Sequence, residues 1–234
     1  GCSGLTNLLI PAGVLTIDSS AFQGCTGLNE INIPASVATL GTAVFDGCSR
    51  LTAITVAGGN SAFSGPGGVL FNKALTVLIQ YPPGRNGAYA VPAGVTTLGN
   101  NAFRNCPGLT AVTLPAGLAS IGSSAFENCT GLTAIALPSS VSAIGSYAFY
   151  GCSRLGGVTL PAGVTTIADG TFEGCRRLAS IHLPNSVTSI AARAFVNCSA
   201  LSGVTLPPAV AAIGGSAFYG CTGLTGLAIP SRSE

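Results

Sequence analysis

One stretch of the chain decides the fold: LTAVTLPAGLASIGSSAFENC, which runs from Leu109 to Cys129. In the next copy of this stretch, one residue separates Ile135 from Leu137, so an extended backbone points both side chains to the same face. A proline follows, and its ring fixes φ and removes the N–H that a strand ladder needs. Each copy therefore begins with a short strand and then turns.

Copies of this stretch recur as a 23-residue repeat. The step from Cys48 to Cys106 is longer, because it contains one regular unit and one irregular unit. Three columns share the phase: prolines from Pro11 to Pro230, the cysteines Cys2, Cys25, Cys48, Cys106, Cys129, Cys152, Cys175, Cys198 and Cys221, and the phenylalanines Phe22, Phe45, Phe103, Phe126, Phe149, Phe172, Phe195 and Phe218. A 23-residue coil cannot bury its own apolar residues, so the period predicts stacked coils with a shared core and about ten strands.

The second half of each unit predicts two further elements. A Val-x-x-Ile segment, such as Val141 to Ile144, predicts a short extended stretch on the opposite wall. A Ser, Thr, Asn or Asp residue then suits the N-cap of one helical turn that directs Ala and Phe inward. The turn ends in a column that is always Gly or Asn, for which we expect positive φ: Gly24, Gly47, Asn105, Asn128, Gly151, Gly174, Asn197 and Gly220.

One unit departs from the pattern within what we predict to be a single solenoid of residues 1–234. Residues 57–91 form a 35-residue irregular repeat, in which two apolar runs flank Asn72 to Leu75 and predict a hairpin. Such an interruption carries side chains that the regular columns lack, here Tyr81, Arg85 and Tyr89, which are candidate contacts for a partner.

The composition argues against several classes of function. Only 7% of residues are charged and the net charge is +2, with the arginines scattered, so nothing favours nucleic acid as a partner. The sequence contains no run of 18 apolar residues, so we do not expect insertion into a membrane. The chain opens at Gly1 without Met and stops at Glu234 just after a repeat begins, which indicates a segment of a longer protein.

The residues that could carry chemistry also fit structural roles. Zinc sites use closely spaced cysteine pairs, and the chain has no Cys-x-x-Cys, so we expect buried reduced thiols beside the phenylalanine column. The single histidine, His182, falls on an outward strand position with small neighbours, which does not suit a catalytic base. The acids include no pair that the sequence places in one cleft. We therefore expect no enzymatic activity, metal ion or cofactor.

The repeat motif Leu-x-x-Ile-x-Leu-Pro-x-x-Val-x-x-Ile-Gly-x-x-Ala-Phe-x-x-Cys resembles the BspA-like class of leucine-rich repeats, over essentially the whole chain. The resemblance implies an α/β leucine-rich-repeat solenoid, mostly β with one short helical turn per 23-residue coil, curved as a right-handed superhelix. It also implies a cell-surface or secreted protein that adheres to matrix proteins such as fibronectin and fibrinogen, or to another cell surface.

Two functions follow as hypotheses. In the first, the chain is a non-catalytic protein-binding module that uses the outward residues of its strands. In the second, the chain is a structural element that packs side by side or end to end, since so neutral a surface is weakly protected against self-association. An ice-binding surface is a third hypothesis, but Ala, Gly and His interrupt the row of outward threonines that such a surface would need. The candidate partner-binding residues are Asn32, Thr55, Thr113, Thr159, His182 and Thr205.

Overall fold

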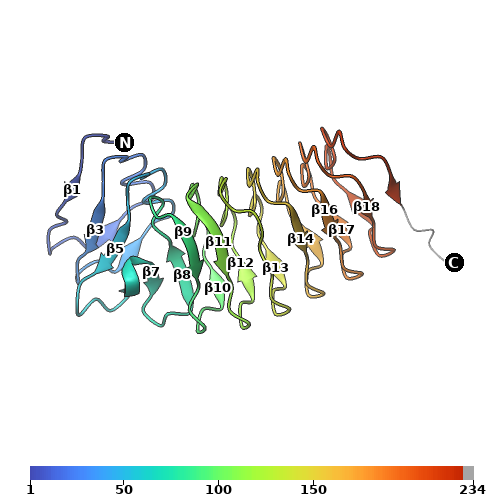
Figure 1. Cartoon of the computed structure of the whole chain (residues 1–234). Helices are drawn as coiled ribbons and strands as arrows, with labels where there is room; N and C mark the ends of the chain where they lie inside the picture. Colours follow the sequence, from blue (N-terminus) through green and yellow to red (C-terminus); the bar gives the residue numbers. More distant parts are fainter. Residues whose placement is uncertain (229–234) are drawn as a thin grey trace.

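The computed structural model describes residues 1–228 and shows a rod of stacked coils, with the N-terminus at one end (Figure 1). Paired strands of neighbouring regular coils run parallel, and their partners lie one repeat apart, as in Asn7 with Glu30 and Glu30 with Ala53. Among the described residues, the only helix is η1, a 3-10 turn at Pro66–Gly68. The fold is a mostly-β solenoid.

The first wall of the rod consists of the strands that begin each unit. In β3 (Glu30–Ile33), the side chains of Ile31 and Ile33 are buried and those of Glu30 and Asn32 are exposed, as the alternating sequence predicts. Its other strands are β1 (Asn7–Leu8), β5 (Ala53–Val56), β9 (Gly87–Ala90), β11 (Leu109–Thr113), β14 (Gly157–Thr159), β16 (Ser180–His182), β18 (Val204–Thr205) and β20 (Leu227–Ala228).

The second wall contains the Val-x-x-Ile segments, and their predicted extended conformation is confirmed. Between the walls the chain turns at proline: the N–H of Val141 bonds to the carbonyl oxygen of Pro138, and other units repeat this bond. Pro230 lies outside the described residues. The strands of the second wall that come from regular coils are β2 (Thr16–Ile17), β4 (Thr39–Leu40), β10 (Thr97–Leu98), β12 (Ser120–Ile121), β13 (Ala143–Ile144), β15 (Thr166–Ile167), β17 (Ser189–Ile190) and β19 (Ala212–Ile213).

The corner that closes each coil is a pair of tight turns. All eight residues of the Gly/Asn column have φ between 54° and 75°, so the predicted left-handed conformation is confirmed. A second left-handed column, which the sequence did not indicate, lies four residues earlier: Ser20, Ala43, Asn101, Ser124, Tyr147, Gly170, Arg193 and Ser216.

This second column explains why the structure shows no helical turn at the corner. A left-handed residue cannot continue a right-handed helix. The alternate N–H groups instead bond to the next coil: Asn101 to Ser123, Phe103 to Ala125 and Asn105 to Glu127, at 2.7–3.0 Å. The corner is therefore a ladder between coils, and the handedness of the superhelix stays a prediction.

Two columns fill the core beside this corner. The phenylalanine rings stack on one another, with centroids 4.9–5.6 Å apart from Phe103 to Phe218. The thiol of Cys152 donates to the carbonyl oxygen of Phe126 at 3.0 Å, and Cys175 repeats the bond to Phe149 at 3.1 Å. All nine cysteines are free, and all except Cys2 are buried. The structure thus places the thiols where the sequence predicts them.

The irregular unit begins where Asn60 diverts the chain. The Asn60 side chain donates to the carbonyl oxygens of Pro34 and Val37 and accepts from the N–H groups of Ala62 and Phe63. The chain then forms β6 (Phe63–Ser64), β7 (Leu70–Asn72) and β8 (Val77–Gln80). β7 is antiparallel to both β6 and β8, and β8 pairs in parallel with β10, so this segment belongs to the second wall.

Two substitutions at Gly174 should separate the conformational requirement of the corner from its space requirement. Gly174 has φ of 75°, and an added Cβ would lie at an ordinary contact distance, 3.5 Å, from Gly151 Cα. We expect Gly174→Asn to be nearly neutral and Gly174→Val to lose about 1–2 kcal/mol of unfolding free energy, because the left-handed region tolerates Asn. Urea unfolding followed by circular dichroism measures both, and equal losses would contradict the assignment.

The buried thiols should resist alkylation. Burial raises the pKa of Cys48 to about 11 and that of Cys129 to about 12, and the thiolate is the reactive species. At pH 8 iodoacetamide should therefore label Cys2 alone in the folded protein and all nine cysteines in guanidinium chloride. Intact mass spectrometry counts the labels. A second cysteine that reacts as fast as Cys2 would contradict the burial of this column.

Candidate functional site

The six outward residues predicted for partner binding are all exposed on the first wall. The structure brings them together in pairs. Asn32 lies opposite Thr55 and donates to its hydroxyl at 2.9 Å, and Thr159 lies opposite His182. Thr113 and Thr205 lie in two further sheets, because the first wall is divided into the groups β1-β3-β5, β9-β11, β14-β16 and β18-β20.

A groove of about 590 Å³ lies where the pairing of the first wall breaks. Ile135 forms a single bridge to Val112, and no ladder joins it to β14 in the described chain. The surface is open between these coils, where the ladder is missing. The groove is lined by Ile135, Ala136, Leu137, Ser139, Gly157, Val158, Thr159, Leu160, Pro161, Ser180, Ile181 and His182.

The chemistry of this groove is that of a contact surface. His182 and Thr159 supply its imidazole and hydroxyl, beside the hydroxyls of Ser139 and Ser180, and the other lining side chains are apolar or absent. No carboxylate lines it to orient His182 as a base. The groove therefore offers a few hydrogen-bonding groups on an apolar floor, which suits recognition of a partner.

The irregular repeat does not present Tyr81 and Tyr89 as free contacts. Tyr81 is 2% exposed, and its ring lies 5.1 Å from that of Phe103 and 4.8 Å from that of Tyr89. Tyr89 is half-buried, and burial raises its pKa to about 12. Arg85 lies over the Tyr81 ring at 5.8 Å. The prediction for Tyr81 is corrected: its ring is needed in the core and is not available to a partner.

Tyr81 takes the place of the phenylalanine that this unit lacks. Its N–H bonds to the carbonyl oxygen of Ala102 at 2.7 Å, as the N–H of Phe103 bonds to Ala125. The separation of Tyr81 from Phe103 is one residue short of the repeat period, so spacing could have assigned Tyr81 to the core. Its place in an interruption of the repeat made the sequence suggest a surface role instead.

A cluster of charged and aromatic side chains at the corners was missed by the sequence analysis. A shallow cleft there is lined by Glu127, Tyr147, Tyr150, Glu173 and Arg193. Nε of Arg193 donates to Glu173 at 2.9 Å, and Arg104 pairs with Glu127 at 2.8 Å. Two acids do face one cleft, in contrast to the expectation, but each is bound by an arginine. The signal was available: Glu127, Tyr150 and Glu173 occupy the same position in three successive repeats.

The described part of the chain contains neither a metal-binding cluster nor a membrane-spanning helix. Residues 1–228 contain no group of three His, Cys, Asp or Glu side chains placed to hold a metal ion. No helix in that part is long and apolar enough to cross a membrane.

Comparison with known proteins gives a family match. The model of the BspA type leucine rich repeat region matches residues 1–65 and 89–199 in six copies. No curated protein sequence matches significantly.

Solved structures share the fold. A leucine-rich repeat protein from Eubacterium ventriosum is 26% identical with a TM-score of 0.78, over 96% of this chain and 65% of that one. A leucine rich cell surface protein from Faecalibacterium prausnitzii is 32% identical with a TM-score of 0.66, over 95% and 53%. The pneumococcal vaccine antigen PcpA is 20% identical, with a TM-score of 0.58 over 94% and 60%, and shows the fold alone. The chain spans less than two thirds of each of these proteins.

Substitutions at Tyr81 distinguish a core residue from a contact residue. We expect Tyr81→Phe to change the unfolding free energy by less than about 1 kcal/mol and Tyr81→Ala to lower it by about 3–5 kcal/mol, as for a buried aromatic ring. Tyr219→Ala is the control, because Tyr219 is 70% exposed and should cost less than about 0.5 kcal/mol. Chemical denaturation measures all three. A loss at Tyr81→Ala as small as that of the control would show that the ring does not support the core.

Proposed function

Since the chain belongs to the BspA-type leucine-rich-repeat family, we propose that it is a non-catalytic protein-binding module of a cell-surface or secreted, adhesin-like protein, and that its first wall binds the partner. The observation that carries this proposal is the groove at Thr159 and His182, where exposed polar side chains lie above an apolar floor. The similar cell surface protein from Faecalibacterium prausnitzii supports the location.

The partner class follows from the chemistry of the wall. Thr159, His182 and the paired Asn32 and Thr55 offer hydroxyl, imidazole and amide groups, and the groove has no charged side chain. Such a surface favours a protein partner that is matched by shape and hydrogen bonds over one attracted by charge. Extracellular matrix proteins and the surfaces of other cells are the candidates that the family suggests.

A second candidate function is packing within a larger assembly. Leu9 is 88% exposed and Leu15 is 66% exposed in the first coil, and Ile213 is 45% exposed in β19. Few charges surround them, so association of rods end to end or side by side would remove apolar surface from water. In this second function, the partner is another copy of the chain.

Bulky side chains in the groove should separate the two functions. In the double variant Thr159→Trp, His182→Trp, two indoles would obstruct the groove, and we expect binding to matrix proteins to fall by at least about tenfold. The matched control is Thr166→Trp, Ser189→Trp, because Thr166 and Ser189 are paired in the same way on the second wall. Surface plasmon resonance measures each protein against immobilised fibronectin, fibrinogen and itself.

The outcomes separate the two proposals. Saturable binding to a matrix protein that only the groove variant loses supports the first. Self-association without matrix binding supports packing, and equal binding by both variants would remove the groove from the site.

A further inference from the structure

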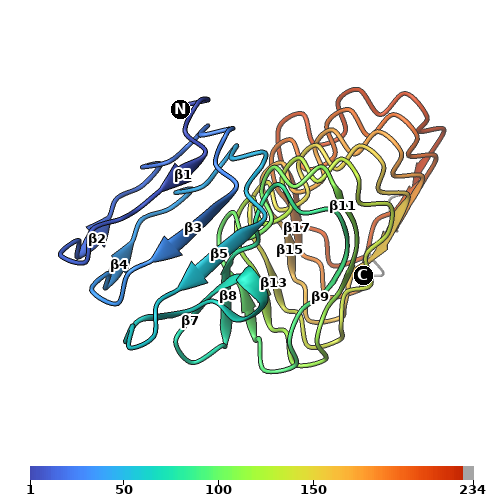
Figure 2. The same cartoon turned by 60° about the vertical axis from the view of Figure 1, so that its left-hand side comes forward.

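The second wall is interrupted between the second coil and the rest of the rod. β4 pairs with β2 on one side, and on its other side no strand of residues 1–228 pairs with it. The next sheet runs in the order β13-β12-β10-β8-β7-β6 and does not include β4. Figure 2 shows the β2-β4 pair standing apart from β7 and β8. The interruption follows Asn60, which binds the N–H groups of Ala62 and Phe63 at the point where the chain enters β6 and not a strand paired with β4.

The free edge of β4 leaves four backbone groups without a partner in the described chain. In a regular coil, the carbonyls of Thr96 and Leu98 accept from Ala119 and Gly122, and the N–H groups of Asn101 and Phe103 donate to Ser123 and Ala125. The coil of β4 precedes the irregular repeat. Its equivalent groups are the carbonyls of Ala38 and Leu40 and the N–H groups of Ala43 and Phe45. Among the described residues none of these four forms a hydrogen bond.

A cavity of about 280 Å³ lies beside this edge. Leu40, Val44 and Phe45 line it on the side of the edge, and Leu70 and Ile79 line it on the other side. Its volume is several times the roughly 30 Å³ share of one liquid water molecule. The cavity has room for a branched apolar side chain next to an added strand.

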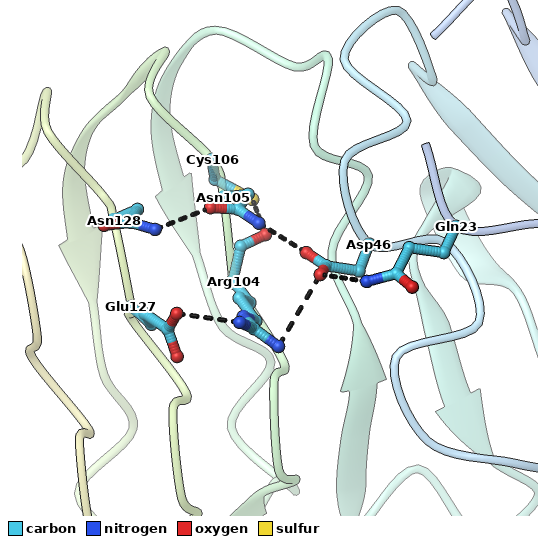
Figure 3. Close-up of polar contacts among 7 residues, drawn as sticks. All are labelled: Gln23, Asp46, Arg104, Asn105, Cys106, Glu127 and Asn128. Carbon is cyan, nitrogen blue, oxygen red and sulfur yellow. Dashed lines mark hydrogen bonds and ion pairs between the residues drawn. The ribbon is translucent and has the colours of Figure 1, made fainter. Parts of the chain in front are cut away.

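Polar contacts hold the two sides of the interruption together at the corner. Asp46 accepts hydrogen bonds from Gln23 at 3.1 Å and from Asn105, and it lies 3.6 Å from the Arg104 guanidinium (Figure 3). Asp46 is 5% exposed. These contacts tie the second coil to the coil of Phe103, so the spacing of the cavity walls is set without any strand between them.

We infer that the unpaired edge that runs from Ala38 through β4 to Phe45 binds a segment of a partner protein that is extended beside β4 and turns with the corner. The segment would donate two N–H groups to Ala38 and Leu40 and direct two carbonyl oxygens to Ala43 and Phe45. One of its apolar side chains would enter the cavity beside Leu70 and Ile79. This site is separate from the first wall and does not rest on the function proposed for that wall.

The edge itself favours a peptide over another ligand. Acceptors at Ala38 and Leu40, followed by donors at Ala43 and Phe45, match a peptide backbone that is extended beside β4 and then turns with the corner, as Ser120 to Ala125 does in a regular coil. Strand addition is a known mode of peptide recognition. Proteins usually protect a free edge with charged residues or proline, and the segment ATLGTAVF from Ala38 to Phe45 contains neither. Ala38, Thr39 and Thr42 are exposed, so a partner can reach this part of the edge from solvent, whereas Phe45, at 1% exposed, is reached only through the cavity that it lines.

A peptide copied from the chain itself can test this site. Leu118 to Ala125, with the sequence LASIGSSA, fills the equivalent place beside β10 in a regular coil. A fluorescent synthetic peptide of this sequence should bind the whole chain saturably, with a dissociation constant below about 1 mM. In NMR spectra of the 15N-labelled protein, the amides of Ala43 and Phe45 should shift most. A peptide N-methylated at the residues equivalent to Ala119 and Gly122 should bind at least about tenfold more weakly, because two hydrogen bonds are lost.

A protein variant tests the cavity. Ile79→Arg places a charged side chain in it and should weaken peptide binding by at least about tenfold. Leu75→Arg, at the exposed end of the hairpin, should have no effect. If Ile79→Arg does not fold, the N-methylated peptide still decides the question.

Two results would overturn the inference. One is the absence of peptide binding up to about 1 mM, or equal binding of the methylated peptide. The other is a dimer in light scattering that Ile79→Arg dissociates, because a second copy would then occupy the edge.

Discussion

Alternate N–H groups at each corner bond to the carbonyl oxygens of the next coil, and the coils can stack only while these groups stay opposite one another. In the regular coils this requirement keeps the repeat unit at one length, because a different length would move the ladder groups of two neighbouring coils out of register. It also explains the composition of the corner. Two left-handed residues, such as Asn101 and Asn105, orient the donors along the rod, and phenylalanine and cysteine fill the space beneath them.

Much of the fold could be predicted because the repeat shows each position many times. Eight examples of Gly or Asn in one column indicated positive φ, and alternation indicated both walls. The helical turn could not be predicted correctly, because Ser, Thr, Asn and Asp suit a helix N-cap and a tight turn equally well. The second left-handed column holds residues as different as Tyr147 and Arg193, so composition gave no sign of it.

Prediction of the candidate sites was less complete for a related reason. Columns identify which residues are outward, and Thr159 and His182 are exposed on the first wall. Columns do not tell where neighbouring coils separate, so the groove at Ile135 and the free edge of β4 were not foreseen. Both arise from hydrogen bonds that are missing between coils, which is a property of pairs of units. Tyr81 was misplaced because its unit has a different length.

The interruption that follows Asn60 also bears on how the rod unfolds. The buried apolar residues form two clusters, one from Ile10 to Leu70 and the other from Val69 to Cys221. In a stacked array the cooperativity passes only from neighbour to neighbour, so a weak interface divides it. The part that contributes the first cluster, which includes the sheet β1-β3-β5, can therefore open as a subglobal unit while the longer part stays folded. Under a pulling force along the rod, the coils should therefore separate first at this boundary, and the irregular repeat would limit the force that reaches the longer part.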